Sequence, residues 1–204
     1  MRVVPLAAFR YNPRAGSQFA GPAENEGANA TPQIALRGSV AIGLRIGIGY
    51  DSHRLGDGGP LRLGGVDVAH DRHLIGHSDA DVLLHAVTDA LLGAAALGDI
   101  GQLFPDDDPA NRGRDSAEML RAAAEATARA GYRIVNLDCV VLAQRPKLAP
   151  HREAIRRRIA EILGIAPQQV GMKAKTGEGV GEVGTEQALV AQCVALLETH
   201  QNES

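Results

Sequence analysis

Hydrophobic and polar positions change pattern at about residue 43, and beyond it they predict alternating strands and helices. The run Leu44–Tyr50 has the β-rich composition of a strand. Two short apolar runs, Leu61–Leu63 and Val66–Val68, are separated by glycines and are typical of a hairpin. The segment from Asp79 to about Leu97 is apolar on every side, which predicts a buried helix.

The same alternation continues to the end of the chain. It predicts a helix over Asp115–Ala130, a strand over Tyr132–Leu142, a helix over Pro150–Leu163, a strand near Val170–Thr176 and a helix over Glu186–Glu198. Four or five strands with three or four helices indicate an α/β fold, a two-layer sandwich in which helices cover one face of a mixed sheet.

Residues 1–43 lack this pattern. The stretch from Arg10 to Arg37 is rich in glycine, alanine, proline and asparagine, which favours a disordered extension before a folded domain over residues 44–204. A targeting peptide is a competing interpretation, but the segment lacks the charged flank and apolar run of about 7–15 residues that a signal peptide has. Glu24 and Glu26 also interrupt any amphipathic presequence. An upstream start codon or a vector remnant is a third interpretation.

Composition narrows the class of protein. The chain has 204 residues, 45% of them hydrophobic, with a net charge of −3, which fits a globular protein and not a nucleic-acid-binding one. It has no apolar run of about 18 residues, so we expect no membrane span. Cys139 and Cys193 lie far apart in the sequence without C-x-x-C spacing, which favours structural thiols in a reducing, cytoplasmic location.

A candidate metal site is formed by Asp51, His53 and His85. Asp51 and His53 are two residues apart at the end of the first predicted strand, so their side chains share one face. His85 lies on the predicted buried helix, where a packed core histidine is the alternative. One carboxylate oxygen and two imidazole nitrogens leave one tetrahedral position open, as zinc needs to polarise a substrate oxygen.

The start of that helix gives two further expectations. Ser78 is the expected N-cap, which would place His77 beside free backbone N–H groups. Asp81 and Asp89 flank His85 by one turn on either side, and each is either an acceptor that orients its imidazole or a solvated helix residue.

Three loops have residue types that could take part in chemistry. Gly177–Gly184 contains G-x-G-x-x-G, but no acidic residue ends a second strand about twenty residues later, so a dinucleotide fold is rejected. A phosphate cradle with Lys175 and Thr176, or a flexible connector, stays open. Phe104–Asp108 is an acidic turn, and Ala143–Leu148 is either a nucleotide-binding loop or a linker.

Several motifs in a fixed order resemble those of the 2-C-methyl-D-erythritol 2,4-cyclodiphosphate synthase family. The resemblance covers about Leu44 to Leu197, and the number of ordered motifs makes it far more specific than any one of them. The motifs are Gly49-Tyr50-Asp51-Ser52-His53, Gly64-Gly65-Val66, His77-Ser78-Asp79-Ala80-Asp81, the run from Leu84 to Gly93, Gly98-Asp99-Ile100-Gly101, Phe104-Pro105-Asp106 and Ala143-Gln144-Arg145-Pro146-Lys147.

The resemblance implies a homotrimeric phosphorus-oxygen lyase of non-mevalonate isoprenoid biosynthesis. It would convert 4-diphosphocytidyl-2-C-methyl-D-erythritol 2-phosphate to 2-C-methyl-D-erythritol 2,4-cyclodiphosphate and CMP. The 2-phosphate would attack the β-phosphorus of the same molecule without a covalent enzyme intermediate, so catalysis would rest on positioning and charge stabilisation.

The resemblance also implies roles for individual residues. The Asp51, His53 and His85 side chains would hold zinc or another divalent metal, and Glu178 would hold Mg²⁺ or Mn²⁺ on the substrate diphosphate. His77 and Thr176 would stabilise the transition state. The substrate would contact Asp51, Ser52, His53, His77, Ser78, Asp99, Ile100, Gly101, Phe104, Pro105, Asp106, Asp107 and Asp108 on the erythritol side, and Ala143, Gln144, Arg145, Pro146, Lys147, Leu148, Ala149, Lys175, Thr176, Gly177 and Glu178 on the CMP side, at a subunit boundary.

This chain departs from the family's pattern in two places. Lys175 precedes Thr176 where threonines are common, which adds a cation. Glu182 and Thr185 stand where an aromatic residue and an arginine line an isoprenoid-diphosphate cavity in many members, so we expect weak product feedback.

Two functions of other classes stay open. A zinc phosphohydrolase would use the same three ligands to activate water, and a non-catalytic trimeric binding protein would keep the fold without the chemistry.

Overall fold

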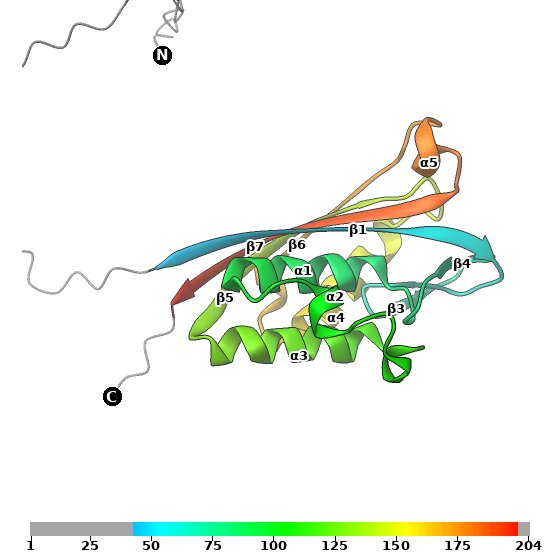
Figure 1. Ribbon diagram of the computed structural model, residues 1–204. Coiled ribbons are helices and arrows are strands. Elements are labelled where there is room, and N and C mark those ends of the chain that lie inside the picture. Colours follow the sequence, from blue (N-terminus) through cyan, green and yellow to red (C-terminus); the bar gives the residue numbers. More distant parts are fainter. Residues whose placement is uncertain (1–42, 200–204) are drawn as a thin grey trace, which may run out of the picture. The chain divides into compact units, whose positions relative to one another are not determined.

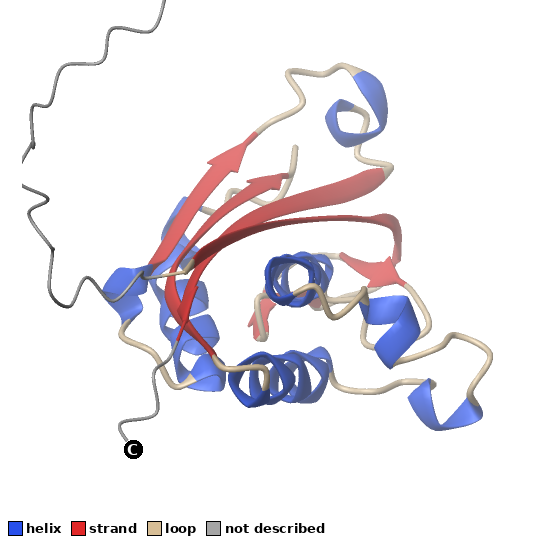
Figure 2. Ribbon diagram, turned by 60° about the vertical axis from the view of Figure 1, so that its left-hand side comes forward, coloured by secondary structure: helices blue, strands red, loops and turns tan. Residues whose placement is uncertain are grey.

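The computed structural model describes residues 43–199 as a five-stranded mixed sheet with its long helices on one face (Figures 1 and 2). Strand order is β4-β1-β7-β5-β6; β5 and β6 are parallel, the other pairs are antiparallel, and β2 and β3 form a separate hairpin. The strands are β1 (Leu44–Asp57), β2 (Leu61–Leu63), β3 (Val66–Val68), β4 (Arg72–Ile75), β5 (Tyr132–Leu142), β6 (Val170–Lys175) and β7 (Ala188–Thr199), and the helices are α1 (Val82–Ala95), α2 (Ile100–Leu103), α3 (Ser116–Arg129), α4 (Arg152–Leu163) and α5 (Gly181–Gly184).

Helix α1 lies directly on β1 because two glycines of that strand face it. A Cβ atom at Gly47 would lie 2.1 Å from the carbonyl oxygen of Ala90, and one at Gly49 would lie 1.9 Å from that of Ala86. Both distances are far inside van der Waals contact, so only glycine permits this approach. The close packing sets the helix over the strand positions that follow, where Asp51 and His53 lie.

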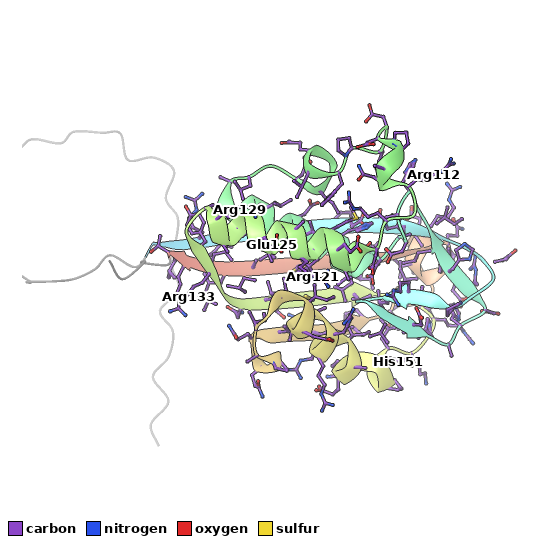
Figure 3. All side chains as sticks on the ribbon, turned by 90° about the horizontal axis from the view of Figure 1, so that it is seen from below. Arg112, Arg121, Glu125, Arg129, Arg133 and His151 are labelled. Atoms are coloured by element: carbon purple, nitrogen blue, oxygen red, sulfur yellow. The ribbon has the colours of Figure 1, made fainter. Side chains whose placement is uncertain are left out.

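Helices α3 and α4 complete the layer below the sheet. The Asp115 side chain caps α3 by accepting a hydrogen bond from the backbone N–H of Ala117, as the sequence predicts. Arg121, Glu125 and Arg129 point away from the sheet on the outer side of α3 (Figure 3). That charged stripe is the solvent side of an amphipathic helix.

The opposite face of the sheet carries exposed apolar side chains. Ile46 and Ile48 of β1 are 73% and 69% exposed, and Tyr50 and Val194 are exposed beside them. Large apolar side chains gathered on one face of a sheet are typical of a surface that meets another protein.

The prediction of a C-terminal helix over Glu186–Glu198 is wrong, because Ala188–Thr199 is strand β7. Its buried side chains alternate strictly, namely Leu189, Ala191, Cys193, Ala195 and Leu197. The residues between them are also largely apolar, which hides a period of two, and alanine, leucine and glutamine favour a helix locally. Pairing with β1 on one side and β5 on the other outweighs that local preference.

Smaller differences concern the ends of elements. The central helix begins with Asp81 as its N-cap rather than Ser78, because Ala80 has a positive φ of 58° and the Asp81 carboxylate accepts from the N–H groups of Leu83 and Leu84. Strand β1 runs on to Asp57, so Asp51 and His53 lie inside it. The edge strand β4 was not predicted. The hairpin, β5 and the helix over Ser116–Arg129 are confirmed.

Cys139 and Cys193 face each other across β5 and β7, with 3.7 Å between buried sulfur atoms. Their hydrogen bond and their burial raise the pKa of the Cys193 thiol far above its usual range. Among the described residues, no helix is both long and apolar enough to cross a membrane. The predicted extension, residues 1–43, lies outside the described residues except for Gly43, so that domain boundary stays a prediction.

Candidate functional site

Strand β1 and helix α1 bring one carboxylate and two imidazoles, all of types that can bind a metal, to one point. Asp51 and His53 face α1 from alternate positions of β1, and His85 faces them from the end of the helix's first turn. The Asp51 Oδ2 atom lies 2.9 Å from His53 Nε2 and 2.9 Å from His85 Nδ1, and the two nitrogens are 3.1 Å apart. We call these three residues the metal triad.

Neighbouring backbone groups orient two members of the metal triad. His53 Nδ1 lies 2.9 Å from the carbonyl oxygen of Ile75, which only accepts, so Nδ1 carries the hydrogen and the Nε2 lone pair faces the other two ligands. The backbone N–H of Ser52 donates to Asp51 Oδ1 at 2.8 Å and leaves Oδ2 for the centre. This arrangement fits a bound cation, because tetrahedral ligands of zinc, with bonds of about 2.0–2.1 Å, lie about 3.3 Å apart.

Electrostatics also favour a positive charge at this point. Partial burial acts to raise the pKa of Asp51, but hydrogen bonds and charge from His53 and His85 outweigh it and hold the pKa well below its usual range. Burial likewise acts to lower the pKa of His53, and its hydrogen bond to Asp51 outweighs this and raises the pKa. An ionised carboxylate therefore stands between two imidazoles, which is the donor set that zinc prefers.

The second ring nitrogen of His85 contacts two hydroxyl groups. His85 Nε2 lies 3.0 Å from Ser78 Oγ and 2.9 Å from Ser116 Oγ. Ser116 is fully buried at the start of α3, and sequence reasoning missed it because Asp115-Ser116 has only the pattern of a helix cap. Its proximity depends on the packing of α3 against α1, which no local pattern reveals.

Neither aspartate proposed to orient His85 does so by a hydrogen bond. Asp81 caps α1, and its carboxylate also accepts from the N–H groups of Gly64 and Gly65 at 2.8 and 2.6 Å. Asp89 accepts from the N–H of Ile100 at 2.7 Å and so ties α2 to α1. Burial raises the pKa of Asp89.

A cavity of about 200 Å³ opens over the metal triad, and we call it the triad pocket. Eight residues that were expected on the erythritol side line this pocket: Asp51, His53, His77, Ser78, Ile100, Gly101, Phe104 and Asp106. Asp89, Asn111 and Met119 were not predicted to line it. The full lining is Asp51, His53, His77, Ser78, His85, Asp89, Ile100, Gly101, Phe104, Asp106, Asn111 and Met119.

The loop over the triad pocket is braced from inside. The guanidinium of Arg114 stacks on the ring of Phe104 at 4.9 Å, and Arg114 also donates to Asn111 Oδ1 at 2.6 Å. Asn111 in turn donates to the carbonyl of Pro105 at 2.9 Å. An adjoining cavity of about 300 Å³ is lined by His77, Asp106, Asp107, Asp108, Pro109 and Arg112.

The residues expected to bind CMP gather around a different cavity, of about 180 Å³, which we call the loop pocket. It shares no lining residue with the triad pocket. Arg145 lies outside it and pairs with Glu186 at 3.3 Å. The lining is Ala143, Gln144, Pro146, Lys147, Leu148, Ala149, Ala174, Lys175 and Thr176.

The glycine-rich loop beside the loop pocket folds back on itself. A Cβ atom at Gly177 would lie 2.4 Å from the backbone nitrogen of Gly184, so both glycines are required for this turn. The Thr176 hydroxyl donates to Glu178 Oε1 at 2.7 Å. The loop leads into the four-residue helix α5, and not into the long helix that the sequence suggested.

Other proposed site residues lie away from both pockets. Ser52 is exposed, on the strand position opposite to that of the metal triad. Asp99 caps α2 by accepting from the N–H of Gln102. Glu182 is exposed, and the Thr185 hydroxyl donates to the carbonyl of Gly181. Neither observation tests the expected weak product feedback, which stays a prediction.

Comparison with known proteins gives consistent matches over the described domain. A curated 2-C-methyl-D-erythritol 2,4-cyclodiphosphate synthase from Rhodopirellula baltica is 60% identical over 156 residues, which is 76% of this chain and 94% of that protein. The solved structure of IspF from Plasmodium falciparum in complex with CDP is 35% identical, with a TM-score of 0.69, and the match covers 78% of this chain and 98% of that one.

A longer protein contains the same fold as one part. The bifunctional IspDF from Campylobacter jejuni is 36% identical, with a TM-score of 0.76, over 79% of this chain and 44% of that one. The model of the YgbB family matches residues 44–198, from the first residue of β1 almost to the last of β7. Because that match spans the whole described sheet and its helices, this chain belongs to the YgbB family.

Proposed function

We infer that this chain is an enzyme of isoprenoid biosynthesis, a 2-C-methyl-D-erythritol 2,4-cyclodiphosphate synthase like its curated relatives. In this reaction an oxygen of the substrate 2-phosphate forms a bond to the β-phosphorus of the same molecule. The bond between that phosphorus and the oxygen of CMP breaks, and CMP leaves with the electron pair. Water does not enter either product.

The observation that carries this inference is the metal triad at the base of a cavity, in a chain 60% identical to a curated synthase. Asp51, Asp89 and Asp106 all line the triad pocket. Such carboxylates would repel a phosphate group unless a cation lay between them, so the acidic lining itself supports a metal-dependent reaction.

At the triad pocket, Asp51, His53 and His85 would hold a zinc ion. When bound, zinc would act as a Lewis acid that withdraws negative charge from a phosphate oxygen. His77, exposed at the rim with its Nδ1 atom 3.8 Å from Asp106, would donate a hydrogen bond to a reacting phosphate. The Asp99–Gly101 and Phe104–Asp108 segments would hold the erythritol and exclude water.

Thr176 and Glu178 would serve the diphosphate. The Thr176 hydroxyl donates to Glu178 in this structure, so it would become free to donate to a phosphate oxygen once Glu178 binds Mg²⁺ or Mn²⁺. Lys175, beside them in the loop pocket, would add a positive charge that complements the diphosphate.

The loop pocket would hold the CMP part of the substrate. The relative from Plasmodium falciparum was solved with CDP, which supports a cytidine nucleotide as the ligand class. Because the triad pocket and the loop pocket share no residue, one active site would combine the triad pocket of one copy with the loop pocket of the next. A homotrimer built through the exposed apolar face of the sheet would supply that arrangement. The cytoplasmic location stays a sequence-based prediction.

The test is incubation of the purified protein with the cytidylyl substrate and Mg²⁺ in ¹⁸O-labelled water, followed by phosphorus NMR and mass spectrometry. We expect equal amounts of CMP and a cyclic diphosphate, neither containing ¹⁸O. A phosphohydrolase would instead place one ¹⁸O in a linear phosphate product, and a binding protein would leave the substrate intact.

A further inference from the structure

A buried serine and an aspartate lie behind the metal triad, on the far side of the His85 ring. Ser116 Oγ is 2.9 Å from His85 Nε2, and the Ser116 hydroxyl donates to Asp79 Oδ1. Ser116 is fully buried and Asp79 is half-buried, and no role has been given above to either. We call them the Ser116–Asp79 pair.

The hydrogen of the Ser116 hydroxyl is committed to Asp79. An ionised carboxylate has only acceptor atoms, so the contact between Ser116 Oγ and Asp79 Oδ1 requires the serine hydrogen. Two other groups hold Asp79 in place: the backbone N–H of Asp81 donates to its Oδ1 at 3.3 Å, and Arg62 places a guanidinium nitrogen 3.8 Å from its Oδ2.

With its only hydrogen committed, Ser116 Oγ can serve His85 only as an acceptor. His85 Nε2 must then carry the ring hydrogen, and a neutral His85 has its lone pair on Nδ1. Nδ1 is the atom that lies 2.9 Å from Asp51 Oδ2 and 3.1 Å from His53 Nε2. The lone pair therefore points to the centre of the metal triad.

Ser78, the other hydroxyl at His85 Nε2, cannot fix the hydrogen in this way. Its Oγ accepts from the N–H of Ala80 at 3.0 Å, but its own hydrogen has no fixed acceptor and Ser78 lines the triad pocket. Ser78 therefore remains free to donate toward the pocket, while the direction of the hydrogen bonds at His85 is set by Ser116.

We propose that the Ser116–Asp79 pair positions His85 as a metal ligand, by holding its ring in the form that binds metal through Nδ1. Neither residue lines the triad pocket, so both would act through His85 as positioning residues. This proposal rests on the proposed metal centre. Loss of such an outer partner typically weakens metal binding by about 10- to 100-fold.

The experiment measures zinc affinity by letting the protein compete with a chromogenic chelator. Four full-length proteins are compared: the parent and the variants Ser116→Ala, Asp79→Asn and Thr127→Val. Thr127 is the matched control, because it also carries a buried hydroxyl on α3. It is 1% exposed, and its hydroxyl makes no hydrogen bond within the described residues. We expect Ser116→Ala and Asp79→Asn each to weaken zinc binding by about 10- to 100-fold, and Thr127→Val by less than about twofold.

The double variant separates a connected pair from two independent effects. If Asp79 acts through Ser116, the Ser116→Ala/Asp79→Asn protein should bind zinc about as weakly as the weaker single variant. Fully additive losses would overturn the proposal. Thermal unfolding of the metal-free proteins runs in parallel, and a loss of zinc affinity fully matched by unfolding would also count against it.

Nitrogen-15 NMR of the zinc-loaded protein reads the ring directly. We expect the His85 hydrogen on Nε2, exchanging slowly with water in the parent and faster in Ser116→Ala. A hydrogen on Nδ1 would overturn the proposal. A parent that binds no zinc would overturn the metal centre itself, whereas a parent and a Ser116→Ala variant that bind zinc equally would overturn only the Ser116–Asp79 pair.

Discussion

Each side chain of the metal triad has one atom fixed by the surrounding protein and one atom facing the centre. His53 is held by the carbonyl of Ile75, and Asp51 by the N–H of Ser52. Ligands fixed in this way lose little conformational entropy when a metal binds, which favours high affinity. These contacts also hold an ionised carboxylate and two ring nitrogens close together, and this arrangement favours a bound cation.

Replacing His85 by alanine should remove zinc from the protein. Structural zinc sites bind with about 10–16 kcal/mol, so one ligand of four contributes about 3 kcal/mol, which is about a hundredfold in affinity. We expect His85→Ala to purify with little zinc and to lose turnover, as measured by elemental analysis and CMP release. His73→Ala, at an exposed histidine outside the triad pocket, is the control. Full zinc content in His85→Ala would disprove the ligand assignment.

At the scale of elements, the site depends on the closeness of α1 to β1. The glycines Gly47 and Gly49 and the alanines Ala86 and Ala90 let the two backbones meet, and this brings His85 to Asp51 and His53. A slightly larger separation would open the metal triad without changing any of its residues.

Gly49→Ala should therefore damage both stability and metal binding. The new Cβ would lie 1.9 Å from the carbonyl oxygen of Ala86, and overpacking of this kind costs about 1–3 kcal/mol or more. We expect a lower melting temperature and a weaker zinc affinity. Gly93→Ala is the matched control on α1, since its Cβ would meet no atom closer than 3.9 Å and alanine favours a helix. Equal behaviour of the two variants would contradict this account.

Elements with one dominant pattern could be predicted from the sequence, and those whose pattern depends on a partner could not. The strand over Tyr132–Leu142 and the α3 helix were found because alternation and the Asp115 cap are local signals. Strand β7 was missed because it is apolar on both faces, one toward α1 and one toward the exposed side of the sheet. For the same reason the sequence revealed Asp51, His53 and His85 but not Ser116, whose place depends on helix packing.

At the scale of the whole molecule, the apolar face of the sheet and the two separate pockets have one common explanation. A cyclic assembly would cover Ile46, Ile48 and Tyr50 and would bring the triad pocket of one copy to the loop pocket of another. The exposed apolar face is the observation that supports an assembly of several copies, and the shared active site is proposed on that basis.

Ile48→Asp should break this assembly. A charge at the centre of a buried apolar interface is strongly unfavourable, whereas Ile48 is 69% exposed in the single chain, so its fold should survive. Light scattering should show a trimer for the parent and a monomer without turnover for the variant. Arg121→Asp, which places an aspartate on the outer side of α3 instead, is the control that should stay trimeric (Figure 3). A fully active monomer would disprove a shared active site.

Deleting residues 1–42 should change the melting temperature by no more than about 2 °C, because the sequence there has no pattern capable of packing. Turnover should also be kept. Calorimetry and CMP release of the shortened protein measure both, and a large loss of stability would show that the segment docks on the folded domain.

The absence of any shared lining residue between the triad pocket and the loop pocket also makes genetic complementation possible. His85→Ala spoils only the first pocket, and Thr176→Ala spoils only the second. Each variant alone would be inactive, but in trimers formed from both, some sites would join two intact halves. Random mixing in equal amounts would restore about one quarter of the sites of a cyclic assembly. Two inactive alleles expressed together in one cell would then restore product formation. They could not do so if each chain held a whole active site.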